Sequence, residues 1–169
     1  LGLAAEGYIS RSEFVPDAVV VKLVLERINE PEVARCGVLL DGFPRTVAQA
    51  KALSELVDIE RFLLLQLNDA ACIDRVLSRR VDSKTGDIYN LTSAPPPVGE
   101  IADRCVRREV HVDEKQVRGR LQVYHGQLGL ILPHFRGKIQ VVNAAKTSAD
   151  VAAQLDQRLR ETPAPPPLP

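Results

Sequence analysis

The stretch that decides the fold is Gly37-Val38-Leu39-Leu40-Asp41-Gly42-Phe43-Pro44-Arg45-Thr46. A short apolar run ends at an acidic residue, and glycine and proline then interrupt regular pairing. We predict a buried strand over residues 36–41, although such a run alone is also compatible with the core of a helix. A turn and a helix over residues 46–57 are expected to follow. This order of elements is typical of the ligand-binding edge of an open α/β sheet.

Two side chains in this turn suit phosphate chemistry. Asp41, at the expected strand tip, can hold a metal ion through water. Arg45 offers a rigid, two-pronged donor to a phosphate group. The competing interpretation is structural, with an acidic turn closed by a local salt bridge.

The hexapeptide at residues 41–46, followed by Gln49, resembles the signature of adenylate kinases and related nucleoside monophosphate kinases. Weaker similarity extends this resemblance to nearly the whole chain. It implies an α/β, three-layer P-loop nucleotide kinase fold, in which a parallel sheet is flanked by helices and carries a lid insertion. It also implies reversible phosphoryl transfer from ATP to AMP with Mg²⁺.

Composition narrows the class of protein. A chain of 169 residues can bury one sizeable core. Its 22 basic and 22 acidic residues balance, so no attraction to nucleic acid or to an anionic membrane is expected. Cys36, Cys72 and Cys105 are too dispersed for a zinc site or a disulfide scaffold, which favours a reducing, cytoplasmic location. Because the sequence lacks methionine, we expect it to be a piece of a longer protein or assembly.

The apolar spacing along the chain predicts the remaining elements. One helix is predicted to start at Pro16-Asp17 and to end near Asn29, others cover about residues 46–57, 69–80 and 113–132, and a last one starts from Ser148. Further strands are expected at residues 62–67 and 139–142. We divide the chain into a partial core with the end of a nucleotide-binding arm (1–80), a lid insertion (81–112), the C-terminal part of the core (113–161) and a proline-rich tail (162–169).

Arginines occur at three places where phosphoryl transfer would need them. The reaction requires aligned phosphates, neutralised charge and exclusion of water, which arginines converging from a closing lid can supply. Arg45 lies in the turn. The entry side of the expected lid carries Arg75, Arg79 and Arg80, and its exit side carries Arg107, Arg108 and Arg120. The lid is expected to be mobile in the absence of ligand.

The resemblance assigns roles to individual residues. Asp41 is expected to order the water shell of Mg²⁺ and, with Arg45, Arg79 and Arg120, to act in catalysis. The residues implied for AMP binding are Val15, Gly42, Arg45, Gln49 and Arg108. Those implied for ATP binding are Arg75, Arg79 and Lys146. The simpler alternatives are that Gln49 only caps a helix and that Arg75 and Arg79 form a solvated helix face.

The sequence also departs from the family pattern. No Gly-x-x-x-x-Gly-Lys phosphate loop occurs, so the chain alone is expected to be inactive. In the family the strand that precedes this loop lies between the strands matching 36–41 and 62–67, so we expect no direct ladder between those two strands here. The paired aspartates after the lid are missing around Arg108, which leaves Arg107 and Arg108 equally plausible. Ala144 replaces a glycine near the adenine. These departures keep two alternatives open, a non-catalytic kinase-like module within a larger protein or assembly and a kinase for another base.

Overall fold

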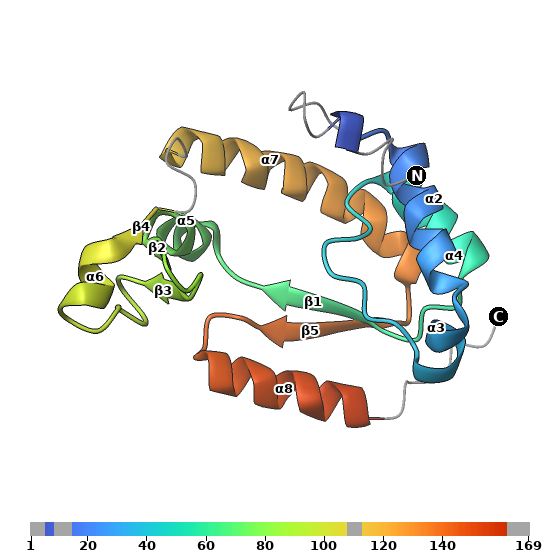
Figure 1. The fold of residues 1–169 in the computed structure, drawn as a ribbon. Helices are drawn as coiled ribbons and strands as arrows, with labels where there is room; N and C mark the ends of the chain where they lie inside the picture. The colour runs from blue at the N-terminus through green and yellow to red at the C-terminus, as the bar shows by residue number, and fades with distance from the viewer. Residues whose placement is uncertain (1–5, 9–14, 108–112, 162–169) are drawn as a thin grey trace. The chain divides into compact units, whose positions relative to one another are not determined.

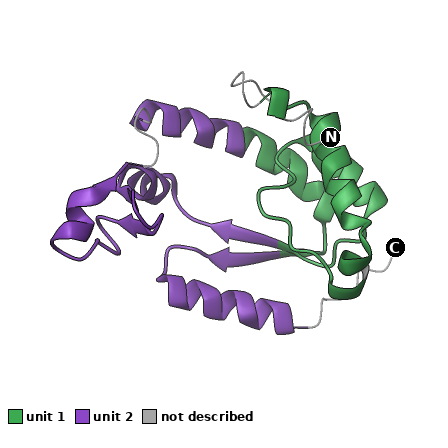
Figure 2. Cartoon of the chain, in the orientation of Figure 1, with its two compact units in different colours: residues 1–62, 125–139, 163–169 green, residues 63–124, 140–162 purple. Residues whose placement is uncertain are grey.

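The computed structural model describes residues 6–8, 15–107 and 113–161. The chain consists of two compact units, which Figure 2 colours separately. Unit 1 contains residues 1–62, 125–139 and 163–169, and unit 2 contains residues 63–124 and 140–162. The helix α7 (Glu114–Ile131) contributes to both.

Unit 1 is built around the helix α4 (Val47–Leu56). The unit also contains α2 (Asp17–Ile28), α3 (Pro31–Cys36), the end of α7 and the short 3₁₀ helix η1 (Leu132–Phe135). Its buried core is formed by Ala50, Leu53, Ile131 and Phe135. The Phe62 ring stacks on Phe135, with ring centroids 4.8 Å apart. The two helices predicted for this unit are confirmed. Ala50 and Leu53 of α4 lie in the core, and Ile28 at the end of α2 packs against it.

The strand predicted over residues 36–41 is wrong. Pro31 begins the helix α3, which extends to Cys36, and Gly37 then ends it with φ +77°. Proline at the first helical positions lacks only a hydrogen bond that would be unused there, which favours this helix. Residues 37–40 form no strand, and Val38 and Leu39 are 41% and 81% exposed. A strand requires a neighbour, and no described strand pairs with this segment.

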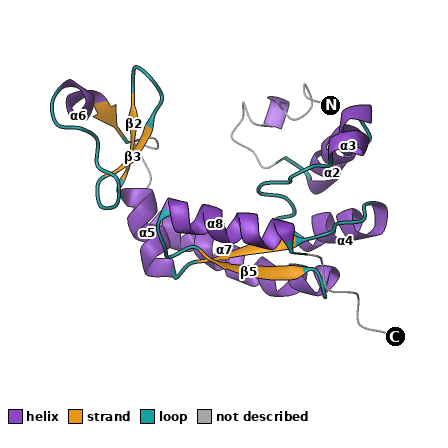
Figure 3. Cartoon of the chain, turned by 90° about the horizontal axis from the view of Figure 1, so that it is seen from below, coloured by secondary structure: helices purple, strands orange, loops and turns teal. Residues whose placement is uncertain are grey.

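Two paired strands lie mainly in unit 2. Their arrows in Figure 1 point in the same direction, so the strands are parallel. The strands are β1 (Phe62–Gln66) and β5 (Ile139–Asn143), close to their predicted positions. Backbone hydrogen bonds from Phe62 N to Lys138 O and from Ala144 N to Gln66 O close the two ends. The helix α8 (Ser148–Arg160) lies beside this sheet, as Figure 3 also shows, and Val142 is fully buried. The α/β class with a parallel sheet flanked by helices is therefore confirmed.

A second, antiparallel sheet occupies the segment expected to form the lid. It contains β2 (Arg79–Asp82), β3 (Ile88–Asn90) and β4 (Cys105–Val106), in the order β3-β2-β4, with the short helix α6 (Glu100–Arg104). The preceding helix α5 (Asp69–Leu77) ends earlier than predicted. Arg79 lies in β2 opposite Asn90, so the interpretation of Arg79 as part of a solvated helix face is wrong. Strand pairing overrides the helical spacing of the arginines here.

The parts of the chain that the structure describes contain no helix long and apolar enough to cross a membrane. The three cysteines are free thiols. Arg108 and the proline-rich tail lie outside the described residues.

Candidate functional site

The turn from Asp41 to Thr46 is shaped by a contact between Arg45 and Gly42. Gly42 has φ +70°, a conformation that residues with a side chain rarely adopt. The guanidinium of Arg45 lies against it: a Cβ atom at Gly42 would be 2.5 Å from Nη2 of Arg45. Glycine is therefore needed both for the backbone and for the position of the arginine.

Asp41 and Arg45 are both exposed. Within the described ranges neither side chain forms an ion pair, so the local salt bridge considered as an alternative is absent. A carboxylate oxygen is a ligand that Mg²⁺ accepts, directly or through water. The described residues contain no cluster of three or more His, Cys, Asp or Glu side chains, and Asp41 is the one acidic residue in the sequence from residue 41 to 46.

Replacing Gly42 by alanine tests this packing, and Gly37 provides a matched control. Both glycines have positive φ, but a Cβ atom at Gly37 meets nothing within 4 Å. Both variants should lose stability by about 1–2 kcal/mol from backbone strain, measured by chemical denaturation. Only Gly42→Ala should also displace the Arg45 guanidinium and weaken AMP binding, measured by calorimetry. Equal AMP affinity in the two variants would contradict the role in AMP binding that the resemblance implies for Gly42 and Arg45.

Gln49 anchors the turn from the first part of α4. Its backbone N donates to Oγ1 of the N-cap residue Thr46, at 3.2 Å. Its side-chain Oε1 accepts from the backbone N of Arg45 at 2.7 Å, and its Nε2 donates to Oδ1 of Asp17 at 2.7 Å. The Gln49 residue is only 6% exposed. The bond to Thr46 is the helix cap considered above. The side-chain bonds of Gln49 to Arg45 and Asp17 go beyond what a cap explains. Val15, half-buried, precedes Asp17 by two residues.

A second set of predicted residues meets within unit 2. Nη2 of Arg75, at the end of α5, donates to the backbone O of Ala144 at 2.8 Å. Ala144 is 7% exposed and directly follows β5, and Lys146 is exposed two residues later. The structure therefore brings Arg75 to the loop that also carries Lys146.

The arginines of the antiparallel sheet have different surroundings. Arg79 is half-buried, and its side chain has no hydrogen-bond or ion-pair partner among the described residues. Nη1 of Arg80 donates to the backbone O of Leu77 at 3.0 Å and of Arg79 at 2.8 Å. Arg107 is exposed just after β4, and Arg120 is exposed on α7.

The sequence analysis missed an ion pair between Asp82 and Arg104. Asp82 is 1% exposed, and its two carboxylate oxygens accept from Nε and Nη2 of Arg104, each at 2.7 Å. The backbone N of Lys84 also donates to Oδ1, at 2.9 Å. These bonds, the one from Arg104 above all, hold the pKa of Asp82 well below its usual range, and the pair raises the pKa of Arg104. The turn-forming residues after Asp82 are typical of a local bond such as the one from Lys84 N. Nothing in the sequence indicated a bond to Arg104, which is 22 positions away.

Comparison with known proteins identifies the family. The sequence model of the family described as adenylate kinase matches residues 1–140. "Adenylate kinase, chloroplastic" of Zea mays is 36% identical over 159 residues, which cover 94% of this chain and 71% of the relative. "Adenylate kinase" of Fusobacterium nucleatum is 34% identical over 162 residues, covering 92% and 75%. "Probable adenylate kinase 2, chloroplastic" of Oryza sativa is 36% identical, but the chain spans only 54% of its length. The chain belongs to the adenylate kinase family.

Proposed function

We propose that the protein is a nucleoside monophosphate kinase of the adenylate kinase type, which transfers a phosphoryl group reversibly from ATP to AMP. The observation that carries the proposal is the exposed guanidinium of Arg45. It packs on Gly42 without a protein counter-ion in the described ranges, in a chain of the adenylate kinase family. An arginine so placed can bind an anion in a bidentate manner.

Most of the residues proposed to bind the acceptor nucleotide belong to unit 1. Arg45 and Gly42 would hold the AMP phosphate, Val15 would contact its base, and Gln49 would belong to the same nucleotide site. The exposed side chain of Asp41 would hold Mg²⁺ through water. The ion, when bound with ATP, neutralises charge on the phosphate groups.

The donor nucleotide is assigned to residues outside unit 1. Arg75 would lie over the adenine of ATP, with Lys146 nearby on the loop that Arg75 contacts. Arg79 and Arg120 would bind the phosphates, whereas Arg108 would contribute to binding of AMP. Arg79 supports this assignment through its lack of a counter-ion among the described residues.

These residues act by position and charge. A bidentate arginine fixes the acceptor phosphate for in-line attack, and several arginines stabilise the charge on the transferred group. We propose that residues 81–112 form a lid that closes on ATP and excludes water, that residues 1–80 and 113–161 form the core, and that the tail is a spacer. We also propose that the protein is located in the cytoplasm, a reducing compartment that suits free thiols.

The test is an assay of the full-length protein with ATP, AMP and Mg²⁺, followed by measurement of ADP. We expect ADP formation with AMP, and slower reaction when UMP replaces AMP or GTP replaces ATP. Failure to bind or convert any nucleotide would favour the non-catalytic module. Preference for UMP or GTP would favour a kinase for another base.

The 169-residue chain alone should form no ADP. It lacks the lysine and the backbone amides of a phosphate loop, which no other stretch of its sequence supplies. Measurable ADP formation by the purified chain would overturn this part of the proposal.

A further inference from the structure

Asp17 is bonded to both polar side chains that begin α4. It is the first residue of α2 and is half-buried. Its Oδ2 accepts from Oγ1 of Thr46 at 2.8 Å, and its Oδ1 accepts from Nε2 of Gln49 at 2.7 Å. These bonds join segments about 30 positions apart in the sequence. Asp17 therefore connects the start of α2 to the turn that carries Arg45.

The carboxylate determines how the Gln49 amide is oriented. An ionised carboxylate can only accept hydrogen bonds, so it selects the Nε2 side of the amide. The Oε1 side is then directed to the backbone N of Arg45, 2.7 Å away. Because Gln49 is almost fully buried, water cannot easily replace either bond. The orientation of one amide thus links Asp17 to the Arg45 backbone.

We propose that Asp17 is a positioning residue for Arg45. Through Gln49 it holds the backbone of Arg45, and through Thr46 it holds the start of α4. The proposal rests on the proposed function in one respect, that Arg45 binds the phosphate of AMP. Since Val15 lies two residues before Asp17, the same carboxylate connects the segment proposed to contact the base with the arginine proposed to bind the phosphate.

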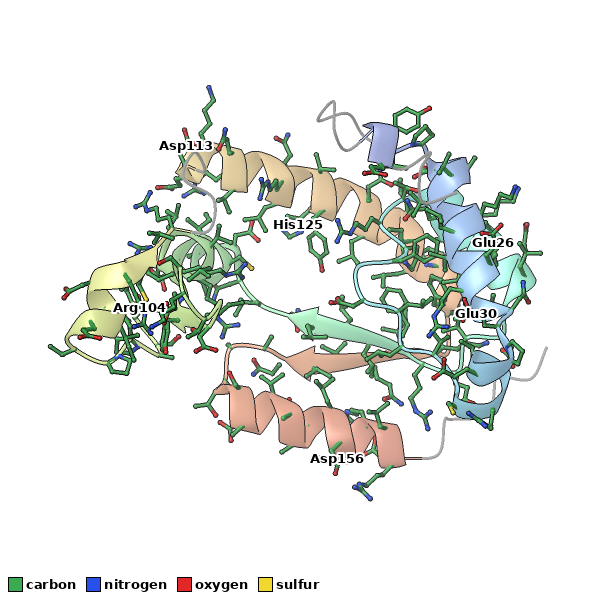
Figure 4. All side chains as sticks on the ribbon, viewed as in Figure 1. Glu26, Glu30, Arg104, Asp113, His125 and Asp156 are labelled. Carbon is green, nitrogen blue, oxygen red and sulfur yellow. The ribbon has the colours of Figure 1, made fainter. Side chains whose placement is uncertain are left out.

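The first experiment measures this linkage without any nucleotide. Asp17→Asn keeps the shape but can also donate, so it no longer selects one orientation of the Gln49 amide. In the full-length protein, hydrogen exchange at the Arg45 amide should become about tenfold faster, the scale of one weakened hydrogen bond. The control is Glu26→Gln, which removes an exposed carboxylate from the same helix (Figure 4) and should leave this rate unchanged.

A donor and acceptor exchange provides the rescue. Gln49→Glu alone places a second carboxylate beside Asp17 and should also speed exchange at Arg45. Combining Asp17→Asn with Gln49→Glu restores one donor and one acceptor at this contact, with the original net charge. Exchange at Arg45 should then return close to the wild-type rate. An unchanged rate in Asp17→Asn, or no recovery in the double variant, would overturn the proposal.

The second experiment measures nucleotide binding by calorimetry. Asp17→Asn should weaken AMP binding about tenfold and change ATP binding less than twofold, with an unfolding midpoint that shows a folded protein. Faster exchange at Arg45 with unchanged AMP affinity would overturn the positioning role. If the wild-type protein binds no AMP, the proposed function fails, while the exchange measurements still decide whether Asp17 positions Arg45.

Discussion

Replacing Arg45 by alanine is expected to slow phosphoryl transfer at least about a hundredfold in the full-length protein, as measured by ADP formation with saturating ATP. Such a loss is typical when a preorganised charged donor is removed from a transition state. The affinity for ATP alone should change less than twofold, because we assign Arg45 to the acceptor nucleotide. Arg45→Lys should recover only part of the rate, since a lysine keeps the charge but loses the planar pair of donors.

Arg136→Ala is the matched control for Arg45. Arg136 is exposed, follows η1 in the same unit, and its side chain has no ion-pair partner among the described residues. Its removal should leave the rate unchanged. An Arg45→Ala variant with the turnover of the wild type would exclude Arg45 from the site.

Replacing Asp82 by asparagine is expected to destabilise the antiparallel sheet strongly. The change removes the charge that holds Arg104, whose side chain lies on α6 (Figure 4), and leaves a guanidinium without its partner. Breaking one side of a buried ion pair is among the most destabilising single changes. Hydrogen exchange of the β2 amides should become at least about tenfold faster, and transfer should fall if this sheet carries Arg79 to the phosphates.

The same ion pair predicts a dependence on pH. The pKa of Asp82 is lower in the folded protein than in the unfolded chain, so its ionisation stabilises the fold above the ordinary aspartate pKa of about 4. This contribution should decline progressively as the pH falls below that value, and protection of β2 should decline with it. Asp82→Asn should remove this part of the pH dependence.

Glu100→Gln is the control for the ion pair. Glu100 is an exposed carboxylate on α6, the helix that also carries Arg104, and it has no ion pair among the described residues. Its removal should affect neither the exchange of β2 nor its pH dependence. Equal exchange in the two variants would show that the Asp82 pair does not stabilise the sheet.

Most of the regular elements could be predicted because they depend on local spacing. The apolar stripe of α4 and the capping by Thr46 gave its position to within one residue. The strands β1 and β5 were found because short apolar runs bounded by polar residues are typical of buried strands. The same reasoning failed at residues 36–41, where an apolar run has no strand partner in the described structure and begins after a helix.

The candidate site divides in the same way. The hexapeptide from Asp41 to Thr46 was sufficient to indicate the family, because its residues are contiguous and specific. The bonds of Gln49 to Asp17, and of Arg75 to Ala144, could not be predicted, because each joins residues distant in the sequence.

The sequence by itself determined the family, the α/β class, most helices and strands, and the turn that carries Arg45. These depend on residue type and spacing within about ten positions of the chain. Only the tertiary structure decided that Arg79 lies in a strand, that Asp82 is paired with Arg104, and that Asp17 orients Gln49. Each of those outcomes depends on which distant segment lies nearby, and a hydrogen bond or an ion pair forms only between groups that the fold has already brought within about 3 Å.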